Sequence, residues 1–344
     1  MLYAFELSGE HPTIPRSEVL ACLSLENLDY EQTHCFDQCL LVDIRGNSDT
    51  IEAALVSVSG RLAMSHHILK VIGICANDVN EIIKMAAEAD IHQHISSDMT
   101  YAVRARKIRT HARLHGEYLE KKVGGTIYRK GYRANLKKPD VMFRLLISNK
   151  CIFGSVVASI DRSAYEKRAP HKKPFFYPGV LMPRTARALI NISGILPGKN
   201  ILDPFCGTGG ILVEAAMIKS HVIGMDAQSK IISGARMNLD YYSLDHSLMT
   251  GDATRIPLAD ECMDAIVTDP PYGRSALIHA RSLNNLYSES MKEMYRILRP
   301  GSLAVIVSEK QIDEHSIKAG FKICEKHNQY VHRSLTRTIL VLEK

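Results

Sequence analysis

The amino-acid sequence predicts an α/β protein in which a smaller α+β unit precedes a doubly wound domain built on a parallel sheet. The chain has 344 residues, more than one domain usually contains, and 46% of them are apolar, enough for ordinary buried cores. Residues 182–344 repeat the order strand, glycine turn, helix, which is typical of a parallel sheet with helices on both faces. Residues 1–160 alternate helical and extended patterns, which indicates an α+β module.

The first part of the chain is expected to contain two units, residues 1–49 and residues 50–160. The first contains an apolar opening, a helix-like stretch and an apolar run, at residues 2–7, 15–25 and 39–44. The second is expected to contain a helix followed by a strand, an amphipathic helix, a strand, a helix that stops at Gly124-Gly125, and two strands, at residues 51–72, 78–89, 101–106, 110–123, 141–147 and 151–160.

Positive charge is concentrated in one stretch of the chain. The net charge is +6, but residues 100–175 hold 19 Lys and Arg against 5 Asp and Glu, a local excess of +14. A solvated basic face is the simplest interpretation of such a run. Aromatic residues interleave here and could stack on bases while the cations neutralise phosphates, which favours a polyanionic partner. They are Tyr101, Tyr118, Tyr128, Tyr132 and Phe143.

Residues 161–179 are expected to be a linker, because basic residues mix there with three prolines and the apolar residues follow neither a helical nor a strand period. In residues 180–344 strands are expected at 200–202, 221–225, 264–268 and 302–308, and helices at 209–219, 228–240 and 282–298. Residues 321–342 contain two strand-like runs that could pair as an antiparallel hairpin at the sheet edge.

Membrane and metal functions are not expected. No apolar run approaches the roughly 20 residues that cross a bilayer, and residues 1–10 lack the pattern of a secretory signal, so we expect a cytoplasmic protein. The eight cysteines show no C-x-x-C spacing of a structural zinc site. The close cluster of Cys35, Cys39 and His34 is interpreted as ordinary side chains, so no metal is expected. We expect a monomer.

A glycine-rich turn provides the strongest cofactor signal. It is the segment Ile201-Leu-Asp-Pro-Phe-Cys-Gly-Thr-Gly-Gly-Ile, which leads from a strand into a helix. Its glycines let the backbone approach a ligand at the carboxyl end of a strand. A dinucleotide fingerprint that continues from Gly207 and Gly209 would need a glycine or alanine where Leu212 stands, which disfavours NAD. A Walker loop is also absent from the sequence.

Two further acids stand where a ligand with an adenosine group would need them. Asp226, 19 residues after Gly207, ends the second strand and can accept hydrogen bonds from both ribose hydroxyls. Asp252, in Thr250-Gly-Asp-Ala, can accept from an adenine amino group. Each acid alone is more often a loop or cap residue, but together with Asp203 they favour S-adenosylmethionine. The remaining candidate cofactor residues are their neighbours Cys206, Thr208, Ala227 and Ala253.

The most specific motif is Asp269-Pro270-Pro271-Tyr272-Gly273, directly after the strand expected at 264–268. An amino nitrogen of a purine is a poor nucleophile, because its lone pair is delocalised into the ring. If the Asp269 carboxylate and the Pro270 carbonyl accept its two N–H groups, the lone pair is freed, and the prolines fix these acceptors in advance. Tyr272 would stack on the base. The alternative is an ordinary proline-stiffened turn.

These motifs resemble the class I, Rossmann-like methyltransferases that act on exocyclic amino groups. Residues 50–160, with Tyr101-Ala-Val-Arg-Ala-Arg-Lys, resemble a THUMP domain, and residues 1–49 resemble the ferredoxin-like unit that precedes it. The segment from Arg168 to Leu181 is similar to that of the archaeal tRNA (guanine(10)-N(2))-dimethyltransferases, except that Tyr177 stands where a histidine is expected. The resemblance implies tRNA as partner, docked by its acceptor end. The candidate RNA-binding residues are Arg104, Arg106, Lys107, Arg109, Lys172 and Lys173.

Several alternatives remain open from the sequence. The nearest is a sister enzyme that methylates another guanosine of tRNA or of ribosomal RNA. A DNA adenine methyltransferase would share the Asp-Pro-Pro-Tyr chemistry but has no reason to carry a THUMP-like unit. A non-catalytic RNA-binding protein, a THUMP-bearing thiolation enzyme and a nicotinamide oxidoreductase are the other classes, and the intact motif and glycine turn disfavour them. The number of methyl groups added does not follow from the sequence.

Overall fold

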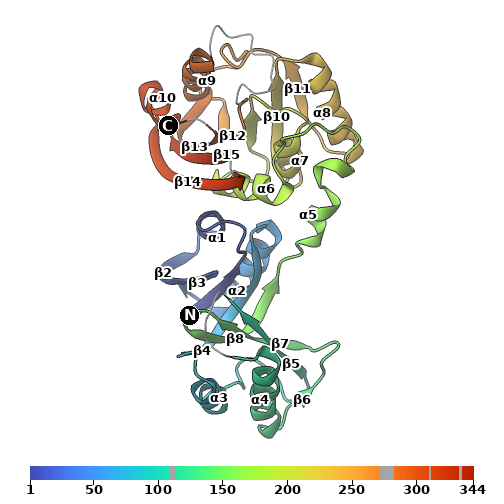
Figure 1. The fold of residues 1–344 in the computed structure, drawn as a ribbon, viewed down its shortest axis with the longest axis vertical. Coiled ribbons are helices and arrows are strands. Elements are labelled where there is room, and N and C mark those ends of the chain that lie inside the picture. The colour runs from blue at the N-terminus through green and yellow to red at the C-terminus, as the bar shows by residue number, and fades with distance from the viewer. Residues whose placement is uncertain (109–113, 272–282, 310, 333–334) are drawn as a thin grey trace. The chain divides into compact units, whose positions relative to one another are not determined.

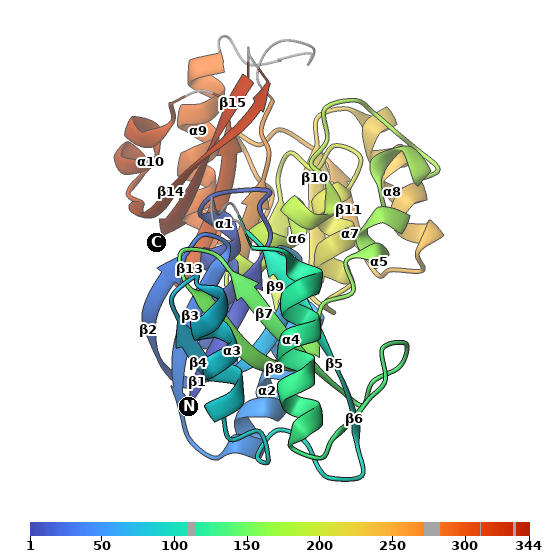
Figure 2. The same cartoon turned by 60° about the horizontal axis from the view of Figure 1, so that its bottom comes forward.

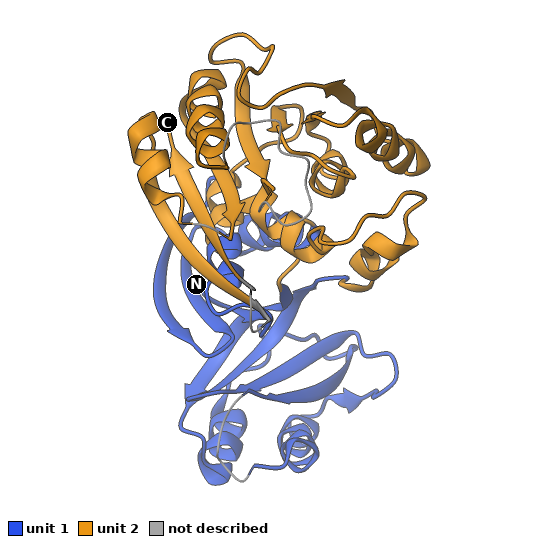
Figure 3. Ribbon diagram, turned by 45° about the horizontal axis from the view of Figure 1, so that its top comes forward, with its two compact units in different colours: residues 1–19, 26–60, 65–161 blue, residues 20–25, 61–64, 162–344 orange. Residues whose placement is uncertain are grey.

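The computed structural model describes residues 1–108, 114–271, 283–309, 311–332 and 335–344 (Figure 1). The chain divides into two compact units, which Figure 3 shows in two colours. Unit 1 comprises residues 1–19, 26–60 and 65–161. Unit 2 comprises residues 20–25, 61–64 and 162–344.

In the described part of unit 1, eight strands form one mixed sheet in the order β2-β3-β1-β4-β8-β7-β5-β6. The strands are β1 (Leu2–Leu7), β2 (Asp29–Phe36), β3 (Cys39–Arg45), β4 (Ser65–Cys75), β5 (Thr100–Lys107), β6 (Arg133–Ala134), β7 (Val141–Ile147) and β8 (Cys151–Ser159). The helices are α1 (Ile14–Leu25), α2 (Ser48–Arg61), α3 (Val79–Glu88) and α4 (Gly116–Arg129), and α1 and α2 end in segments that belong to unit 2. β1 pairs with β4, so strands from residues 1–49 and 50–160 share a sheet.

Most expected elements of unit 1 are present at the expected places. The amphipathic helix is α3, whose cap residue Asp78 accepts hydrogen bonds from the backbone N–H groups of Asn80 and Glu81 at 2.8 and 3.1 Å. The sequence did not predict β2, because this edge strand is polar and largely exposed and therefore lacks an apolar pattern.

The prediction that a helix stops at Gly124-Gly125 is wrong. α4 runs through both glycines to Arg129, with Val123 and Ile127 buried against the sheet. The hydroxyl of Tyr101, on β5, donates a hydrogen bond to the Gly124 carbonyl at 2.7 Å. Packing on β5 therefore outweighs the low intrinsic helix propensity of glycine.

In the described part of unit 2, seven strands form the order β11-β10-β9-β12-β13-β15-β14. They are β9 (Asn200–Asp203), β10 (His221–Asp226), β11 (Ser247–Thr250), β12 (Met263–Thr268), β13 (Leu298–Ser308), β14 (Lys322–His332) and β15 (Leu335–Glu343). Figure 2 shows β14 and β15 side by side. The helices are α5 (Ser163–Lys167), η1 (Pro170–Lys172), α6 (Pro183–Ile192), α7 (Gly210–Ala216), α8 (Ser229–Tyr241), α9 (Leu283–Ile297) and α10 (Asp313–Ala319). The first five strands are parallel and β14 and β15 form an antiparallel hairpin at the edge, which confirms the predicted fold class.

Both faces of this sheet are buried. Along β12, Ala265 and Val267 point to one face, whereas Ile266 and Thr268 point to the other. All four side chains are fully buried. Side chains of α9 cover one face and form a cluster with residues of β9, β12, β13 and β15; its members include Leu202, Ile266, Met291, Met294, Ile306 and Leu340. Such two-sided burial is typical of doubly wound sheets.

The segment expected to be a linker contains the short helices α5 and η1. Arg168 forms a bidentate ion pair with Glu214 of α7, at 2.6 and 3.0 Å, and Arg187 of α6 binds the same carboxylate at 3.1 Å. Glu214 is buried, so this segment is tied to the helix that follows the glycine turn. Periodicity could not reveal such a side-chain anchor.

The sequence predicted neither a membrane-spanning helix nor a metal site, and the described residues can be searched for both. Within them, no helix is both long and apolar enough to cross a membrane. Nor do three or more His, Cys, Asp or Glu side chains gather there as a metal site would require. The eight cysteines are free thiols.

Candidate functional site

The candidate site lies where the parallel strands of unit 2 end. β9 pairs in parallel with β10 on one side and with β12 on the other, so their carboxyl ends meet at one edge of the sheet. The chain leaves β9 toward β10 and later leaves β12 toward β13. The edge between β9 and β12 is therefore a topological switch point, where α/β sheets bind ligands.

The glycine turn after β9 has the backbone conformation that requires glycine. Gly207 and Gly209 have positive φ angles of 50° and 75°. The turn is held by two backbone hydrogen bonds, from Cys206 to Met225 of β10 at 2.9 Å and from Gly209 to Cys206 at 2.8 Å. A Cβ atom at Gly207 would meet no atom within 4 Å, so there is open space beside this turn for a ligand.

Leu212 also finds an explanation in the packing of α7. This side chain is fully buried, and its Cδ1 atom lies where a Cβ atom at Gly224 of β10 would be. In a dinucleotide-binding fold the small residue is on the helix. Here the small residue is on the strand instead, which explains why the leucine is tolerated.

Asp203 is the most deeply buried acid of the site. Its Oδ1 atom accepts hydrogen bonds from the Thr268 hydroxyl at 2.6 Å and from the Phe205 backbone at 3.1 Å. These bonds join the end of β9 to the end of β12. Burial raises the pKa of Asp203 to about 7, and the nearby charges of Asp269 and Asp226 add to this effect.

Asp226 holds the glycine turn from the neighbouring strand. One carboxylate oxygen accepts from the Gly207 backbone at 3.2 Å and the other from the Gln228 backbone at 3.0 Å. Burial raises the pKa of Asp226 above its usual range. Each oxygen keeps a lone pair that could receive a ligand hydroxyl. Ala227, beside it, is exposed.

Asp252 follows β11 and is exposed, whereas its neighbour Ala253 is buried. The Asp252 side chain accepts a hydrogen bond from the Thr254 backbone at 2.9 Å, which is the behaviour of a turn residue. The other carboxylate oxygen of Asp252 is therefore able to accept a hydrogen bond from a ligand.

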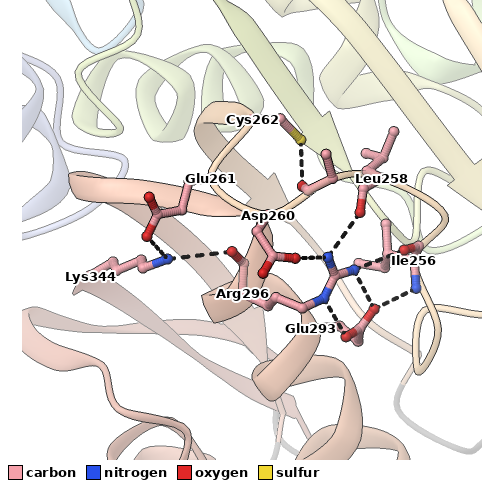
Figure 4. Close-up of polar contacts among 9 residues, drawn as sticks. Ile256, Leu258, Asp260, Glu261, Cys262, Glu293, Arg296 and Lys344 are labelled. Carbon is pink, nitrogen blue, oxygen red and sulfur yellow. Dashed lines mark hydrogen bonds and ion pairs between the residues drawn. The ribbon is translucent and has the colours of Figure 1, made fainter.

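Figure 4 shows how α9 fixes the loop that follows Asp252. The guanidinium of Arg296 donates to the carbonyl groups of Ile256 and Leu258, both at 2.9 Å, and pairs with Glu293 and Asp260 at 2.8 and 2.5 Å. Glu293 in turn accepts from the Ile256 backbone at 2.8 Å. Bonds from one guanidinium to backbone and carboxylates hold this loop in one conformation.

The catalytic candidates Asp269, Pro270 and Pro271 follow β12 directly. The hydroxyl of Tyr287, a buried residue of α9, donates to the Pro271 carbonyl at 3.0 Å. Arg337 of β15 lies 4.0 Å from the Asp269 carboxylate. α9 and β15 therefore both contact the described start of this loop. Tyr272 lies outside the described residues.

A further contact ties the segment before α6 to the glycine turn. The side-chain amide of Asn238, on α8, donates to the carbonyl groups of Phe175 and Thr208, both at 2.9 Å. Its oxygen accepts from the Phe175 backbone at 2.9 Å. Asn238 is fully buried, so this amide is a fixed bridge.

The candidate RNA-binding residues occupy different environments. Arg106 forms an ion pair with the buried Glu6 at 2.7 Å, and Arg104 donates to the Leu136 carbonyl at 2.7 Å. Lys107 and Lys172 are exposed, whereas Lys173 is buried, which lowers its pKa to about 8. Arg109 lies outside the described residues. Among the described members of this set, Lys107 and Lys172 are exposed and Arg104 is partly exposed; RNA binding by any of them stays a prediction.

The residues that the sequence did not single out are Thr268, Tyr287, Arg337 and Asn238. Thr268 could have been found, because it immediately precedes Asp269. The other three come from elements that no local motif connects with the site. Only the packing of α8, α9 and β15 reveals them.

The comparisons with known proteins agree with this geometry. Residues 170–339 match the UPF0020 family model, described as RMKL-like, methyltransferase domain. The tRNA (guanine(10)-N2)-dimethyltransferase of Methanothermobacter thermautotrophicus is 35% identical over 98% of both chains, and that of Pyrococcus abyssi is 31% identical over 99% of both.

Solved structures share the fold at low sequence identity. TrmN from Thermus thermophilus aligns over the whole of both chains with a TM-score of 0.57 and 19% identity. SMU.472, crystallised with SAH, aligns over 99% of this chain and 97% of its own, with a TM-score of 0.57 and 17% identity. The fold, the site and the relatives together place the chain among methyltransferases rather than nicotinamide oxidoreductases or non-catalytic RNA-binding proteins. The chain belongs to the tRNA (guanine(10)-N2)-dimethyltransferase family.

Proposed function

We propose that the protein transfers methyl groups from S-adenosylmethionine to the exocyclic N2 of guanosine 10 in tRNA, first one and then a second. The family relatives are named for this reaction. The observation that carries the proposal is the bond between Thr268 and Asp203 at 2.6 Å. It brings the Asp269-Pro270-Pro271 loop next to the glycine turn, so an amine acceptor and a methyl donor could meet there.

The donor fits the residues that line this edge. Open space beside Gly207 and three acids at successive strand ends suit a ligand with ribose hydroxyls, an adenine amino group and positive charge. Asp226 would hold the ribose and Asp252 the adenine, while Asp203 would hold the turn and face the cationic end. When bound, the donor supplies an electrophilic methyl group on a sulfonium. A structural neighbour crystallised with SAH supports this choice.

The loop after β12 would prepare the amine. The Asp269 carboxylate and the Pro270 carbonyl accept the two N–H groups, so that the nitrogen can pyramidalise and direct its lone pair away from the ring. The bond from Tyr287 to the Pro271 carbonyl keeps the loop in place during this step. In the first transfer the methyl–sulfur bond would break, the donor would leave as a neutral thioether, and the nitrogen would release one proton, which Asp269 can accept. One N–H then remains, and either acceptor can hold it while a second donor molecule supplies the second methyl group.

Residues 50–160 would grip the RNA as a THUMP domain, preceded by residues 1–49 as a ferredoxin-like unit. The basic stretch supports this, and so does a groove of about 460 Å³ between α4, β5 and the β6 region. Tyr101, Arg104, Lys121 and Tyr128 are among its lining residues, and Tyr128 is 66% exposed. An exposed aromatic ring offers a surface on which a base could stack. We propose a monomer in the cytoplasm, where its substrate is found.

Incubation of the full-length protein with labelled S-adenosylmethionine and an unmodified tRNA transcript tests the proposal. We expect label on N2 of guanosine 10, as monomethyl and then dimethyl guanosine. Label on another guanosine of tRNA, or on ribosomal RNA alone, would support the sister-enzyme alternative. Absence of label from every RNA offered would contradict the proposed function.

The substitution Asp269→Asn tests the role of the loop in the same assay. It removes the charged acceptor, and we expect a loss of about a thousandfold or more in the transfer rate, comparable to the removal of a preorganised catalytic contact. Affinity for tRNA should persist, as measured by filter binding. The matched control is Asp245→Asn, an exposed acid of the same unit, which should keep full activity. Equal activity of both variants would refute the assigned role.

A further inference from the structure

We propose that Arg337 is a positioning residue, which keeps the Asp269 carboxylate ionised and oriented toward the substrate amine. This inference rests on the proposed function, because it assigns Asp269 the task of accepting an amino hydrogen. Arg337 stands 68 residues after Asp269 and outside every motif of the sequence.

The geometry places the guanidinium between two partners. Its Nη2 atom lies 4.0 Å from Oδ2 of Asp269 and donates to the Gly179 carbonyl at 3.2 Å. The side chain of Arg337 is 11% exposed and that of Asp269 is 16% exposed. An ion pair so little exposed is screened much less than a surface pair, so its charge matters to the carboxylate.

The sheet register explains why a residue of the terminal hairpin reaches this edge. β13 runs parallel to β12, and Thr268 is level with Ile306. β15 runs antiparallel to β13, with Thr338 opposite Ser308, so the start of β15 lies at the edge where β12 ends. Arg337 is one residue before Thr338, beside Asp269.

The charged groups around Asp269 explain why the positive charge of Arg337 is needed beside it. Asp269 lies close enough to Asp203 of β9 and to Tyr287 of α9 to raise the pKa of each, and Glu309, which follows β13, contributes to the effect on Tyr287. When ionised, the Asp203 carboxylate disfavours a second negative charge at Asp269, whereas the Tyr287 phenol is neutral. Arg337 opposes this effect, since an opposite charge within about 4–6 Å favours the ionised carboxylate.

Arginine differs from lysine at this place in rigidity rather than in charge. One nitrogen, Nη2, makes both contacts, and the planar guanidinium holds that nitrogen in a fixed geometry. The bond to Gly179 fixes the direction from which the charge acts on Asp269. A lysine would keep the charge, but its flexible stem would fix that direction less firmly.

The test compares full-length wild-type protein with Arg337→Gln and Arg337→Lys in single-turnover methylation of a tRNA transcript across a range of pH. We expect Arg337→Gln to lose roughly 10- to 100-fold in rate through misplacement of the carboxylate. Its loss of activity in acid should begin at higher pH than in the wild type, because the protonated carboxyl is favoured. Arg337→Lys should restore the wild-type pH limb and only part of the rate.

Controls separate this inference from folding and from the proposed function. Donor affinity by calorimetry should be unchanged in both variants, which shows a folded donor site. Lys322→Gln, an exposed cation of the same hairpin, should match the wild type. The inference would be overturned if the loss of activity in acid began at the same pH in Arg337→Gln as in the wild type. It would also be overturned if Arg337→Lys kept the full transfer rate. The Lys variant therefore provides the test if the Gln variant does not fold. A wild-type protein without transfer activity would overturn the proposed function instead.

Discussion

Glu6 of unit 1 and Asp203 of unit 2 are both buried carboxylates, but their surroundings act on the charge in opposite ways. Glu6 of β1 accepts from Arg106 and Arg144, each at 2.7 Å. Burial would raise the pKa of Glu6, but the charges of Arg144 and Arg106 and the hydrogen bond from Arg106 outweigh it, and the pKa is lowered. Asp203 of unit 2 is bound by a hydroxyl and a backbone N–H, and its pKa is raised to about 7.

This difference indicates that Glu6 has a structural role, whereas Asp203 belongs to a candidate ligand-binding site. The charge of Glu6 is balanced within the protein, so two arginines of the basic stretch are already engaged in holding the sheet together. The charge of Asp203 is opposed by burial and by Asp269 and Asp226. Raised pKa values at the edge of a sheet, together with open space beside a glycine turn, mark a candidate functional site.

The largest expected effect comes from breaking the balanced cluster of unit 1. Glu6→Gln leaves the charges of Arg106 and Arg144 without their buried carboxylate, and should destabilise the protein by about 4 kcal/mol, since removal of one partner of a buried ion pair is strongly destabilising. Hydrogen–deuterium exchange should become faster in β1, β5 and β7 and stay unchanged in β9 and β12.

The matched control for this variant is Glu52→Gln. Glu52 pairs with Lys70 at 2.8 Å in the same unit but is 37% exposed, so its loss should cost less than about 1 kcal/mol. If Glu6→Gln changed exchange no more than this control, the cluster would not be the structural anchor that its burial indicates.

An effect of about the same size is expected at Asp203, and it depends on pH. Because its pKa is about 7 in the folded chain and 3.8 as the ordinary value, the folded state binds a proton more tightly than the unfolded state. The ligand-free protein should therefore lose stability as pH rises from about 4 to about 7, by about 4 kcal/mol, since each pKa unit corresponds to about 1.4 kcal/mol. Asp203→Asn should remove this dependence.

Chemical unfolding of the ligand-free wild type and Asp203→Asn at several pH values measures this effect. Calorimetry of S-adenosylmethionine binding adds a second readout, because a cationic ligand favours the ionised form of Asp203 and its binding should release a proton near neutral pH. The same stability–pH slope in both proteins would contradict the raised pKa. Asp264→Asn is no suitable control, since Asp264 pairs with Arg299; the exposed Asp245→Asn serves instead.

The smallest expected effect is at Tyr287. Tyr287→Phe removes the hydroxyl that donates to the Pro271 carbonyl but keeps the buried ring. Stability should fall by about 2 kcal/mol, the net value of two hydrogen bonds, because the hydroxyl also bonds to the buried Ser308. The transfer rate should fall more than donor affinity does, because the bond holds the catalytic loop and not the glycine turn. A change in donor affinity with an unchanged transfer rate would contradict this assignment.

The sequence predicted the parts of the site that follow from local pattern and sheet topology. Asp203, Asp226 and Asp269 each end a strand, and parallel strands bring such ends to one edge. The terminal hairpin was also predicted at the correct end of the sheet. These features depend on residues close together in the chain or on a general rule of α/β folds.

The parts that were missed depend on packing between distant elements. Gly124 lies inside α4 because Tyr101 binds its carbonyl, which no helix propensity encodes. Arg337 reaches Asp269 only through the register of β15 on β13. Arg106 was expected to face RNA because of its charge, whereas its partner Glu6 is 100 residues away in sequence. Charge runs show how many cations there are, not which of them are already paired.

A crystal structure of the full-length protein with bound S-adenosylmethionine would test most directly whether methyl donor and amine acceptor meet between β9 and β12. We expect the methionine end of the donor beside Gly207, its ribose on Asp226, and its methyl group turned toward the Asp269-Pro270 loop. A donor bound elsewhere, or with its methyl group directed away from Asp269, would contradict the proposed chemistry.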